Sequence, residues 1–333
     1  MKHIYLLFLF FTTCIFSQET YYTSDPNSVD FNLKGINLKT ALENKIRNNT
    51  TSIPYTDSGF FDTWDALQLT DVNPTNNSEV LLIYGWEDGS DGDVTNDRER
   101  DINNYGGSNG QWNREHVFAK SLATPSLDTN NPGPGTDIHN LRASDVQRNN
   151  DRGNLLYADG LGNSGKVSSD QYWYPGDEWK GDVARIIMYM YLRYDGDGTD
   201  ISETQCLPIN VGVGNPVGND PDMIDLFLQW NADDPVSDVE RQRNSVSETY
   251  QNNRNPFIDD PYLATAIWGG PVAEDTWGIL STNDTATIDF KMYPNPVKND
   301  FLYFSSTEDL KVIVYDVLGK QVEIENINPD KNF

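Results

Sequence analysis

Two stretches of the chain decide how its central part folds: QWNREHVFAKS at residues 111–121 and DIHNLRASDVQRNNDRGN at residues 137–154. A loop rich in proline, glycine and asparagine, residues 124–136, separates them. The second stretch predicts a short strand and then a helix that begins near Ser144 or Asp145, because both residue types cap helix N-termini. A strand, a loop, a second strand and a helix together form a compact frame that can hold several polar side chains around one point.

The polar residues of this frame supply the groups that metal-assisted chemistry on phosphate esters requires. Glu115 and Asn149 offer a carboxylate and an amide oxygen, hard ligands that suit Mg²⁺, which keeps several waters and leaves positions open for phosphate. His116 offers an imidazole that can take a proton from water near neutral pH. The guanidinium of Arg152 can hold phosphate oxygens in pairs, although a role in tying down its own helix is equally open.

Further polar residues are candidates for supporting roles. Arg142, Arg148 and Arg185 are candidates for binding a substrate phosphate, with a surface or salt-bridge role as the alternative for each. His139 stands among apolar residues on the expected strand, which favours a structural role or a role in supporting the metal ligands. Asn154 is placed in the same supporting group.

The order of these motifs resembles the bacterial endonuclease I family of His-Me finger (ββα-metal) nucleases. Arg-Glu-His at residues 114–116 is followed by Asp-x-His-Asn-Leu at 137–141 and Asn-x-Asp-Arg-Gly-Asn at 149–154. Residues 177–185 and 253–259 also match the way that family continues and ends. Any one of these motifs alone is a weak signal, but together they are specific.

The resemblance implies a reaction and a fold. It implies that His116 is the general base and that Glu115 and Asn149 bind the divalent ion. Arg152 is counted as a second catalytic candidate because of its guanidinium group. The expected ion is Mg²⁺, with Ca²⁺ and Mn²⁺ as alternatives. The expected reaction is the largely sequence-non-specific hydrolysis of DNA, and of RNA as a second substrate, to 5′-phosphate ends. We expect an α+β, mostly helical monomer with a ββα-metal motif in a nuclease domain at residues 27–270.

One rival from a different class stays open at this point. A secreted carbohydrate-active or carbohydrate-binding protein would suit the acidity and the 12% aromatic content. It predicts paired catalytic carboxylates in a cleft and no need for Mg²⁺.

Outside the central frame, apolar spacing predicts mostly helices. Residues 182–194 are apolar nearly all round, which is typical of a helix at the centre of a domain. The other expected elements are helices at residues 38–47, 62–69 (with Asp62 as N-cap), 224–230, 237–250 and 261–268, and a buried strand at residues 79–84.

The first residues have the pattern of a targeting segment. Lys2 and His3 precede a largely apolar run, residues 4–16, which is too short to span a membrane but fits a secretory signal. We expect a signal peptide at residues 1–17, with a lipid anchor on Cys14 as the alternative. The mature chain is then secreted, either released or attached to the cell surface, and has no stable membrane insertion.

The last residues form a separate, β-rich pattern. Residues 271–288 form a short polar segment that is typical of a linker. Residues 289–333 contain short runs in which apolar and polar residues alternate. Tyr-Pro-Asn-Pro at 293–296 and Val-Tyr-Asp-Val-Leu-Gly-Lys at 314–320 resemble the C-terminal sorting domain of type IX secretion cargo in Bacteroidetes. The resemblance implies the secretion machinery as a partner. The module has too few strands for an independent sandwich, so we expect it to be partial.

The charge of the chain limits how a nucleic acid could bind. The 333 residues contain 51 acidic and 24 basic side chains, a formal net charge of -27, which argues against a general electrostatic grip on phosphate. Residues 111–156 nevertheless hold five basic and five acidic side chains, so contact must be local and metal-assisted. Two acidic stretches, residues 87–101 and 195–200, leave calcium loops and solvated turns open as alternatives.

Overall fold

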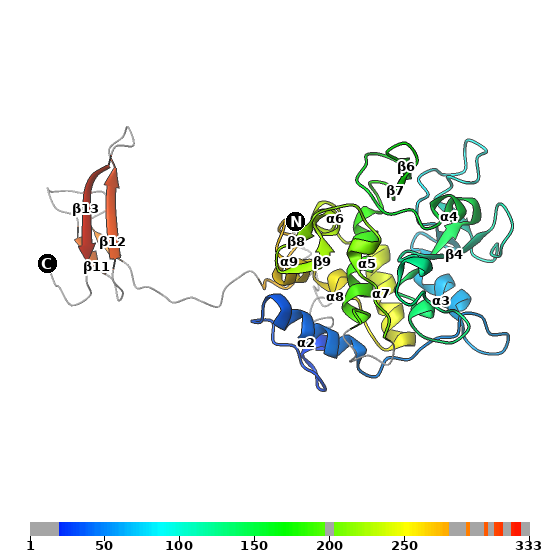
Figure 1. Ribbon diagram of the computed structural model, residues 1–333, viewed down its shortest axis with the longest axis horizontal. Coiled ribbons are helices and arrows are strands. Elements are labelled where there is room, and N and C mark those ends of the chain that lie inside the picture. Colours follow the sequence, from blue (N-terminus) through cyan, green and yellow to red (C-terminus); the bar gives the residue numbers. More distant parts are fainter. Residues whose placement is uncertain are drawn as a thin grey trace, which may run out of the picture. The chain divides into compact units, whose positions relative to one another are not determined.

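A computed structural model describes residues 20–196 and 203–279, together with four strands of the C-terminal part. The expected signal peptide at residues 1–17 lies outside the described residues. The chain divides into two compact units, residues 1–279 and 280–333, which are described here separately (Figure 1). Within the described parts, no helix combines the length and the apolar character that crossing a membrane would need.

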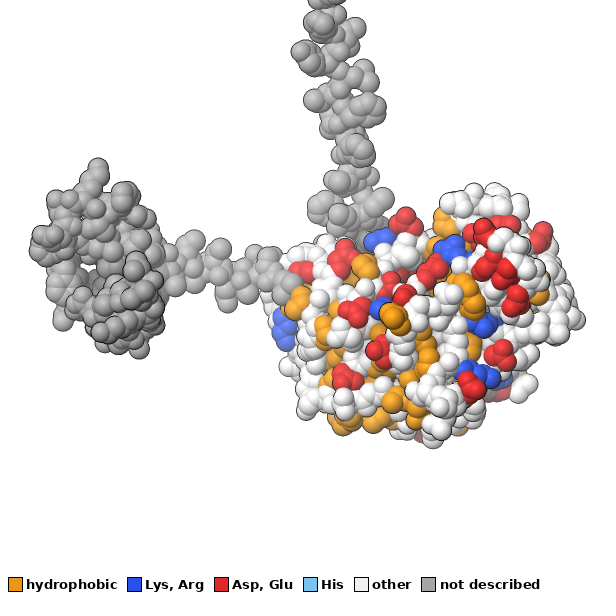
Figure 2. All heavy atoms as spheres, turned by 90° about the horizontal axis from the view of Figure 1, so that it is seen from above, with side chains coloured by type: hydrophobic (Ala, Val, Ile, Leu, Met, Phe, Trp, Pro, Cys, Tyr) orange, Lys and Arg blue, Asp and Glu red, His pale blue; other side chains and the backbone are white. Residues whose placement is uncertain are grey.

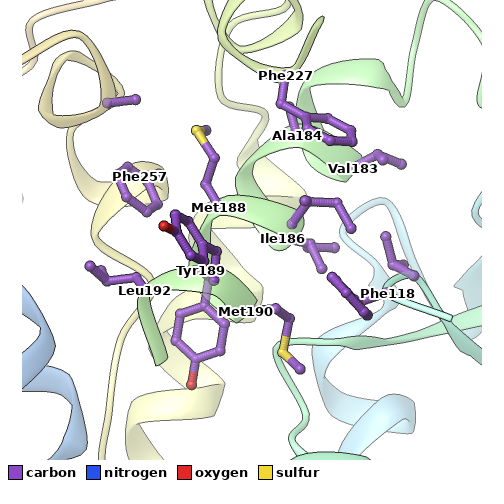
Figure 3. Packing of buried hydrophobic residues seen from close by; sticks show 14 of the residues in the cluster. Phe118, Val183, Ala184, Ile186, Met188, Tyr189, Met190, Leu192, Phe227 and Phe257 are labelled. Carbon is purple, nitrogen blue, oxygen red and sulfur yellow. The ribbon is translucent and has the colours of Figure 1, made fainter. Parts of the chain in front are cut away.

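The core of the first unit is built around helix α5, Lys180–Arg193. Every residue from Gly181 to Arg193 is buried, as the apolar pattern of this segment predicts. Met188 and Met190 are completely enclosed and lie in the cluster that Figure 3 shows. Three helices from other parts of the sequence pack on α5: α2 (Gly35–Arg47), α6 (Asp225–Asp233) and α8 (Pro256–Asp259). Side chains of two more helices, α7 (Asp238–Gln251) and α9 (Tyr262–Trp268), also contact α5.

Capping residues fix where two of the helices begin. Asp62 caps α3 (Thr63–Thr70) and accepts hydrogen bonds from the backbone of Trp64 and Asp65. Ser237 forms a capping box with Glu240 at the start of α7. The expected helices are therefore confirmed, whereas the four-residue helix α8 was not expected because it is too short to show a period.

Two strands and a helix form the frame that the sequence predicts. Strand β4 (Trp112–His116) pairs antiparallel with β5 (Leu141–Asp145), so that His116 lies opposite Leu141. Helix α4 (Val146–Arg152) follows directly, and the Asp145 side chain caps it by accepting from the backbone of Gln147 and Arg148. Helix α4 also contacts β4, so the two strands and the helix form one local unit (Figure 1).

The remaining strands are short. The strand expected at residues 79–84 is β2 (Asn76–Leu81), and it ends earlier, because the backbone N–H of Ile83 turns aside to donate to Ala143 of β5. Strand β2 lies between β1 (Val72–Asn73) and β3 (Glu99–Asp101). Two further antiparallel pairs are β6 (Gly165–Val167) with β7 (Tyr172–Tyr174), and β8 (Pro216–Val217) with β9 (Asp220–Ile224). The unit is thus α+β.

The first unit extends beyond both expected limits of residues 27 and 270. Tyr22 is fully buried, and its hydroxyl donates to Asp259 at 2.8 Å. Residues 271–279, which the sequence assigned to the linker, lie against the domain: Ala273 is buried, and Trp277 packs on Tyr22 with ring centroids 5.4 Å apart. The part of the linker after residue 279 lies outside the described residues.

The described residues of the second unit are four strands. β10 (Lys291–Tyr293) pairs antiparallel with β11 (Tyr303–Ser305), and β12 (Leu310–Tyr315) pairs antiparallel with β13 (Gln321–Ile327). The β-rich character predicted for this part is therefore confirmed at the level of the backbone.

Candidate active site

An open pocket of about 380 Å³ lies over the frame of β4 and α4. Its floor contains three of the four residues that the sequence put first: Glu115, His116 and Asn149. The complete lining is Arg114, Glu115, His116, Ala119, Lys120, Ser121, Asn149, Gly153 and Asn154.

His116, at the end of β4, is held by one backbone oxygen. Its Nε2 lies 2.8 Å from the carbonyl oxygen of Gly135, in the loop that joins β4 to β5. Burial lowers the pKa of His116 to about 4, so the imidazole is neutral at pH 7. A neutral imidazole donates from one nitrogen only; since Nε2–H donates to Gly135, Nδ1 keeps its lone pair and can accept a proton. Glycine is needed at position 135, because a Cβ there would collide with the backbone of Asp128.

Glu115 is buried behind the pocket in a network of hydroxyl groups and one cation. Its Oε1 accepts from the Tyr84 hydroxyl at 3.0 Å and lies 3.2 Å from Nη1 of Arg152. The hydroxyl of Tyr84 also bonds to that of Tyr157 at 2.7 Å. Burial raises the pKa of Glu115 to about 7, despite the neighbouring arginine. The single cation of Arg152 therefore does not offset the cost of burying the charged form of Glu115.

Asn149 is oriented by a neighbouring amide. Its Nδ2 donates to Oδ1 of Asn113 on β4 at 2.8 Å, which leaves Oδ1 of Asn149 as an acceptor for a ligand. In the described parts of the chain, no group of three or more histidine, cysteine, aspartate or glutamate side chains could hold a metal ion.

Arg152 does not reach the pocket. Its side chain is fully buried and donates to the backbone carbonyls of His116 at 3.0 Å and Val117 at 2.8 Å, beside its ion pair with Glu115. The expectation that Arg152 acts on substrate is therefore corrected: this guanidinium ties α4 to the end of β4, which was the other role left open.

Two of the three expected phosphate-binding arginines are also enclosed. Arg142 is fully buried, with its Nε 2.7 Å from Oδ1 of Asp71 and its Nη1 2.7 Å from Oδ2 of Asp182. Arg185 is fully buried and forms a two-point contact with Glu240, at 2.5 and 2.8 Å. Neither is available to a substrate phosphate, because each guanidinium is enclosed with carboxylate partners.

The third expected phosphate-binding arginine, Arg148, is half-buried and lies outside the pocket lining. Its guanidinium lies over the ring of Trp86, 4.3 Å from the ring centre, and Nη2 donates to the Ser164 hydroxyl at 2.8 Å. It joins α4 to loops of the domain rather than facing His116.

The two supporting candidates differ in position. His139 is buried and packs on Tyr189 with ring centroids 4.3 Å apart. Its Nε2 lies 3.3 Å from the carbonyl oxygen of Asn253. It is a structural residue outside the pocket. Asn154 is exposed in the pocket lining, and its Nδ2 donates to the Ser121 hydroxyl at 3.2 Å.

The site predicted from the sequence did not include three polar lining residues, Arg114, Lys120 and Ser121. Alternation along a strand was the available signal for Arg114, because it stands two residues before His116 and so shares its face of β4. The predicted site also left out Tyr84, whose backbone has a positive φ of 75° and whose hydroxyl donates a hydrogen bond to Glu115. No local pattern in the sequence marks that contact.

The pocket differs in charge from the protein around it. Figure 2 shows one face of the domain, on which acidic side chains are widespread, in keeping with the net charge of -27. The charged side chains of the pocket lining are Arg114, Lys120 and Glu115, and Glu115 is already opposed by Arg152. The pocket is therefore a locally basic site on an acidic protein.

Comparison with known proteins identifies both units. Residues 34–262 match the family model of Endonuclease I, and residues 291–333 match that of the secretion system C-terminal sorting domain. An extracellular ribonuclease of Bacillus amyloliquefaciens is 40% identical over 258 residues, which are 75% of this chain and 78% of the relative. An extracellular ribonuclease of Bacillus subtilis (strain 168) is 40% identical over 239 residues, 70% of this chain and 75% of the relative. The chain thus belongs to the endonuclease I family and is a secreted nuclease with a C-terminal sorting domain.

Proposed function

We propose that this enzyme is a metal-dependent, largely sequence-non-specific endonuclease that hydrolyses phosphodiester bonds of RNA and DNA and leaves 5′-phosphate ends. The observation that carries the proposal is the neutral His116 imidazole, anchored by Gly135 in a pocket that also contains Glu115 and Asn149. The names of the two Bacillus relatives support RNA as a substrate, beside the DNA that the sequence analysis expects. The frame of β4, β5 and α4 is the proposed ββα-metal motif.

In this proposal His116 is the general base. Its Nδ1 takes a proton from the water that attacks phosphorus, while Nε2–H keeps its hydrogen bond to the Gly135 carbonyl. The carbonyl dipole then stabilises the imidazolium cation that forms, and the fixed ring holds Nδ1 in one direction.

Glu115 and Asn149 fit a divalent cation. A buried carboxylate whose pKa is raised to about 7 gains from a nearby positive charge, and an amide oxygen without a hydrogen-bond donor supplies a second hard ligand. Mg²⁺ is commonly bound by one or two carboxylates with substrate phosphate and waters, so a cluster of three acidic residues is not needed. When bound, the ion would stabilise the negative charge that develops on phosphate and leaving oxygen.

The carbohydrate-active alternative fits the pocket poorly. Glycoside hydrolysis generally uses two carboxyl groups on either side of the scissile bond. Among the residues that line this pocket, Glu115 is the single carboxylate, and it is paired with Arg152.

The test is cleavage of a supercoiled plasmid and of a single-stranded RNA by the purified protein, with Mg²⁺ and with excess EDTA. We expect both substrates to be cut with Mg²⁺ and neither with EDTA, and we expect the new ends to be ligatable without a kinase step. Cleavage that persists in EDTA contradicts the metal dependence, and ends that need a kinase contradict the 5′-phosphate assignment.

A further inference from the structure

Arg114 is a basic residue of the pocket that the proposed mechanism does not use. Its guanidinium carbon lies 3.5 Å from the centre of the Tyr55 ring and 3.8 Å from that of Trp64, so the flat group is clamped between two aromatic rings. Its hydrogen bonds leave from Nη1, to the backbone oxygen of Tyr55 and to the hydroxyls of Thr56 at 3.1 Å and Thr63 at 3.0 Å. Nη2 makes no hydrogen bond with the residues that the structure describes.

Arg114 stands beside the general base. Residues two apart on a strand point to the same face, so Arg114 and His116 share one side of β4. The Tyr55 ring contacts both residues: it packs on the Arg114 guanidinium and stacks on the His116 imidazole with centroids 5.7 Å apart. The guanidinium of Arg114 and the imidazole of His116 therefore contact the same aromatic ring.

The cation of Arg114 is held by aromatic rings and oxygen acceptors rather than by a carboxylate. Among the described residues, no carboxylate lies within ion-pair distance of Arg114, whereas Arg142, Arg152 and Arg185 each have at least one. A clamped cation without a carboxylate partner, in the wall of an open pocket, is a ready site for an external anion.

We propose that Arg114 binds the phosphate next to the scissile one on the same nucleic-acid strand. In the proposed function His116, Glu115 and Asn149 act on the scissile phosphate, and Arg114 is separated from His116 by its contact with the Tyr55 ring. Nη2 supplies the free N–H donors for a phosphate oxygen, since Nη1 is already bonded and Nε is buried. The aromatic clamp removes the conformational freedom that a surface arginine would lose on binding. This assignment rests on the proposed function, because it names a contact to the same substrate.

The first test measures binding without cleavage. A fluorescein-labelled single-stranded tetranucleotide is titrated with protein in EDTA, and Kd is followed by anisotropy between about 0.1 and 0.4 M salt. For Arg114→Met we expect binding about tenfold weaker and a slope of log Kd against log salt that is smaller by about 0.7, the loss of one phosphate contact. Arg241→Met is the matched control, because Arg241 is exposed on α7 and pairs only locally with Asp238; we expect no change.

The second test separates a phosphate contact from a merely structural role. Wild type and Arg114→Met are compared on a dinucleoside monophosphate, which has only the scissile phosphate, and on the tetranucleotide. We expect KM to rise about tenfold for the tetranucleotide and kcat/KM for the dinucleotide to stay within about threefold. If Arg114→Met does not fold, Arg114→Lys should keep the salt slope and Arg114→Gln should lose it.

An unchanged salt slope in the uncharged variants overturns the assignment. An equal loss on both substrates overturns it as well, because that result means damage to the site or contact with the scissile phosphate. If wild type cleaves neither substrate but the slope still falls in Arg114→Met, the proposed function fails while Arg114 remains an anion-binding residue.

Discussion

Nη1 of Arg152 lies 3.2 Å from Oε1 of Glu115, with both side chains inside the protein. The same guanidinium donates to the carbonyls of His116 and Val117. One buried cation on α4 therefore fixes the carboxylate of Glu115 and the strand end from which His116 projects. Arg152 therefore supports the site from inside the protein rather than forming part of its substrate-binding surface.

Replacing Arg152 should mainly affect stability. Arg152→Met leaves Glu115 buried without its cation, and we expect a loss of about 3–5 kcal/mol in the free energy of unfolding. Urea unfolding at pH 7 measures this, with Arg241→Met as the exposed control. A variant that unfolds like wild type but has lost activity would return Arg152 to the substrate-binding residues.

Arg142 gives a second test of burial against function. Arg142→Met removes the ion-pair partner of Asp182 and one of the two arginine partners of Asp71, which keeps Arg243. We expect destabilisation of about 3–5 kcal/mol, because both carboxylates stay in the interior. Below the unfolding transition, KM for a nucleic acid should stay within about threefold of wild type. A raised KM in a protein of normal stability contradicts the buried position.

His139 should make the domain less stable in acid. Burial lowers its pKa to about 4 from an ordinary 6.5, with Asp137 opposing that shift and Arg243 adding to it. A folded pKa below the unfolded one means that the folded state binds the proton less readily. Stability from the neutral ring is thus complete above pH 6.5 and is lost as pH falls toward 4.

The measurement compares wild type with His139→Gln in urea at pH 7 and pH 5. His139 should account for about 2 kcal/mol of the wild-type loss between these two values, and the variant should lack that part. If both proteins lose the same free energy, the histidine is protonated in the folded state and the assignment is wrong.

Salt should have opposite effects at its two extremes. The net charge of -27 repels a polyanion over long range, and screening reduces this repulsion before it weakens the local contacts in the pocket. Nucleic-acid binding in EDTA should therefore tighten as salt rises from about 5 to 50 mM and weaken above that. A steady decrease from the lowest salt upward means that the acidic surface does not matter.

The sequence was sufficient for features that depend on local order. Asp145 caps α4, and residues 180–193 form the enclosed central helix, because caps and apolar spacing are local signals. Glu115, His116 and Asn149 meet in one pocket because a paired strand and the following helix bring them together.

The sequence did not predict the role of a charged residue where that role depends on whether the side chain is buried. Arg142 lies opposite Glu115 in the register of β4 and β5, yet its side chain pairs with Asp71 and Asp182, which come from distant parts of the chain. Those partners cannot be read from neighbouring residues. Arg114 was missed for the converse reason: it has no carboxylate partner among the described residues, and only tertiary packing brings Tyr55 and Trp64 around it.

The decisive measurement for the general base is the cleavage rate of His116→Ala, compared with that of His139→Gln. Both positions hold buried neutral histidines, but only His116 lines the pocket. With Mg²⁺ and a single-stranded RNA, we expect a rate lower by ~10²–10⁴-fold for His116→Ala and a rate within about threefold of wild type for His139→Gln. Circular dichroism should show that both variants are folded. A loss smaller than about tenfold in His116→Ala would contradict the assignment of His116 as the general base.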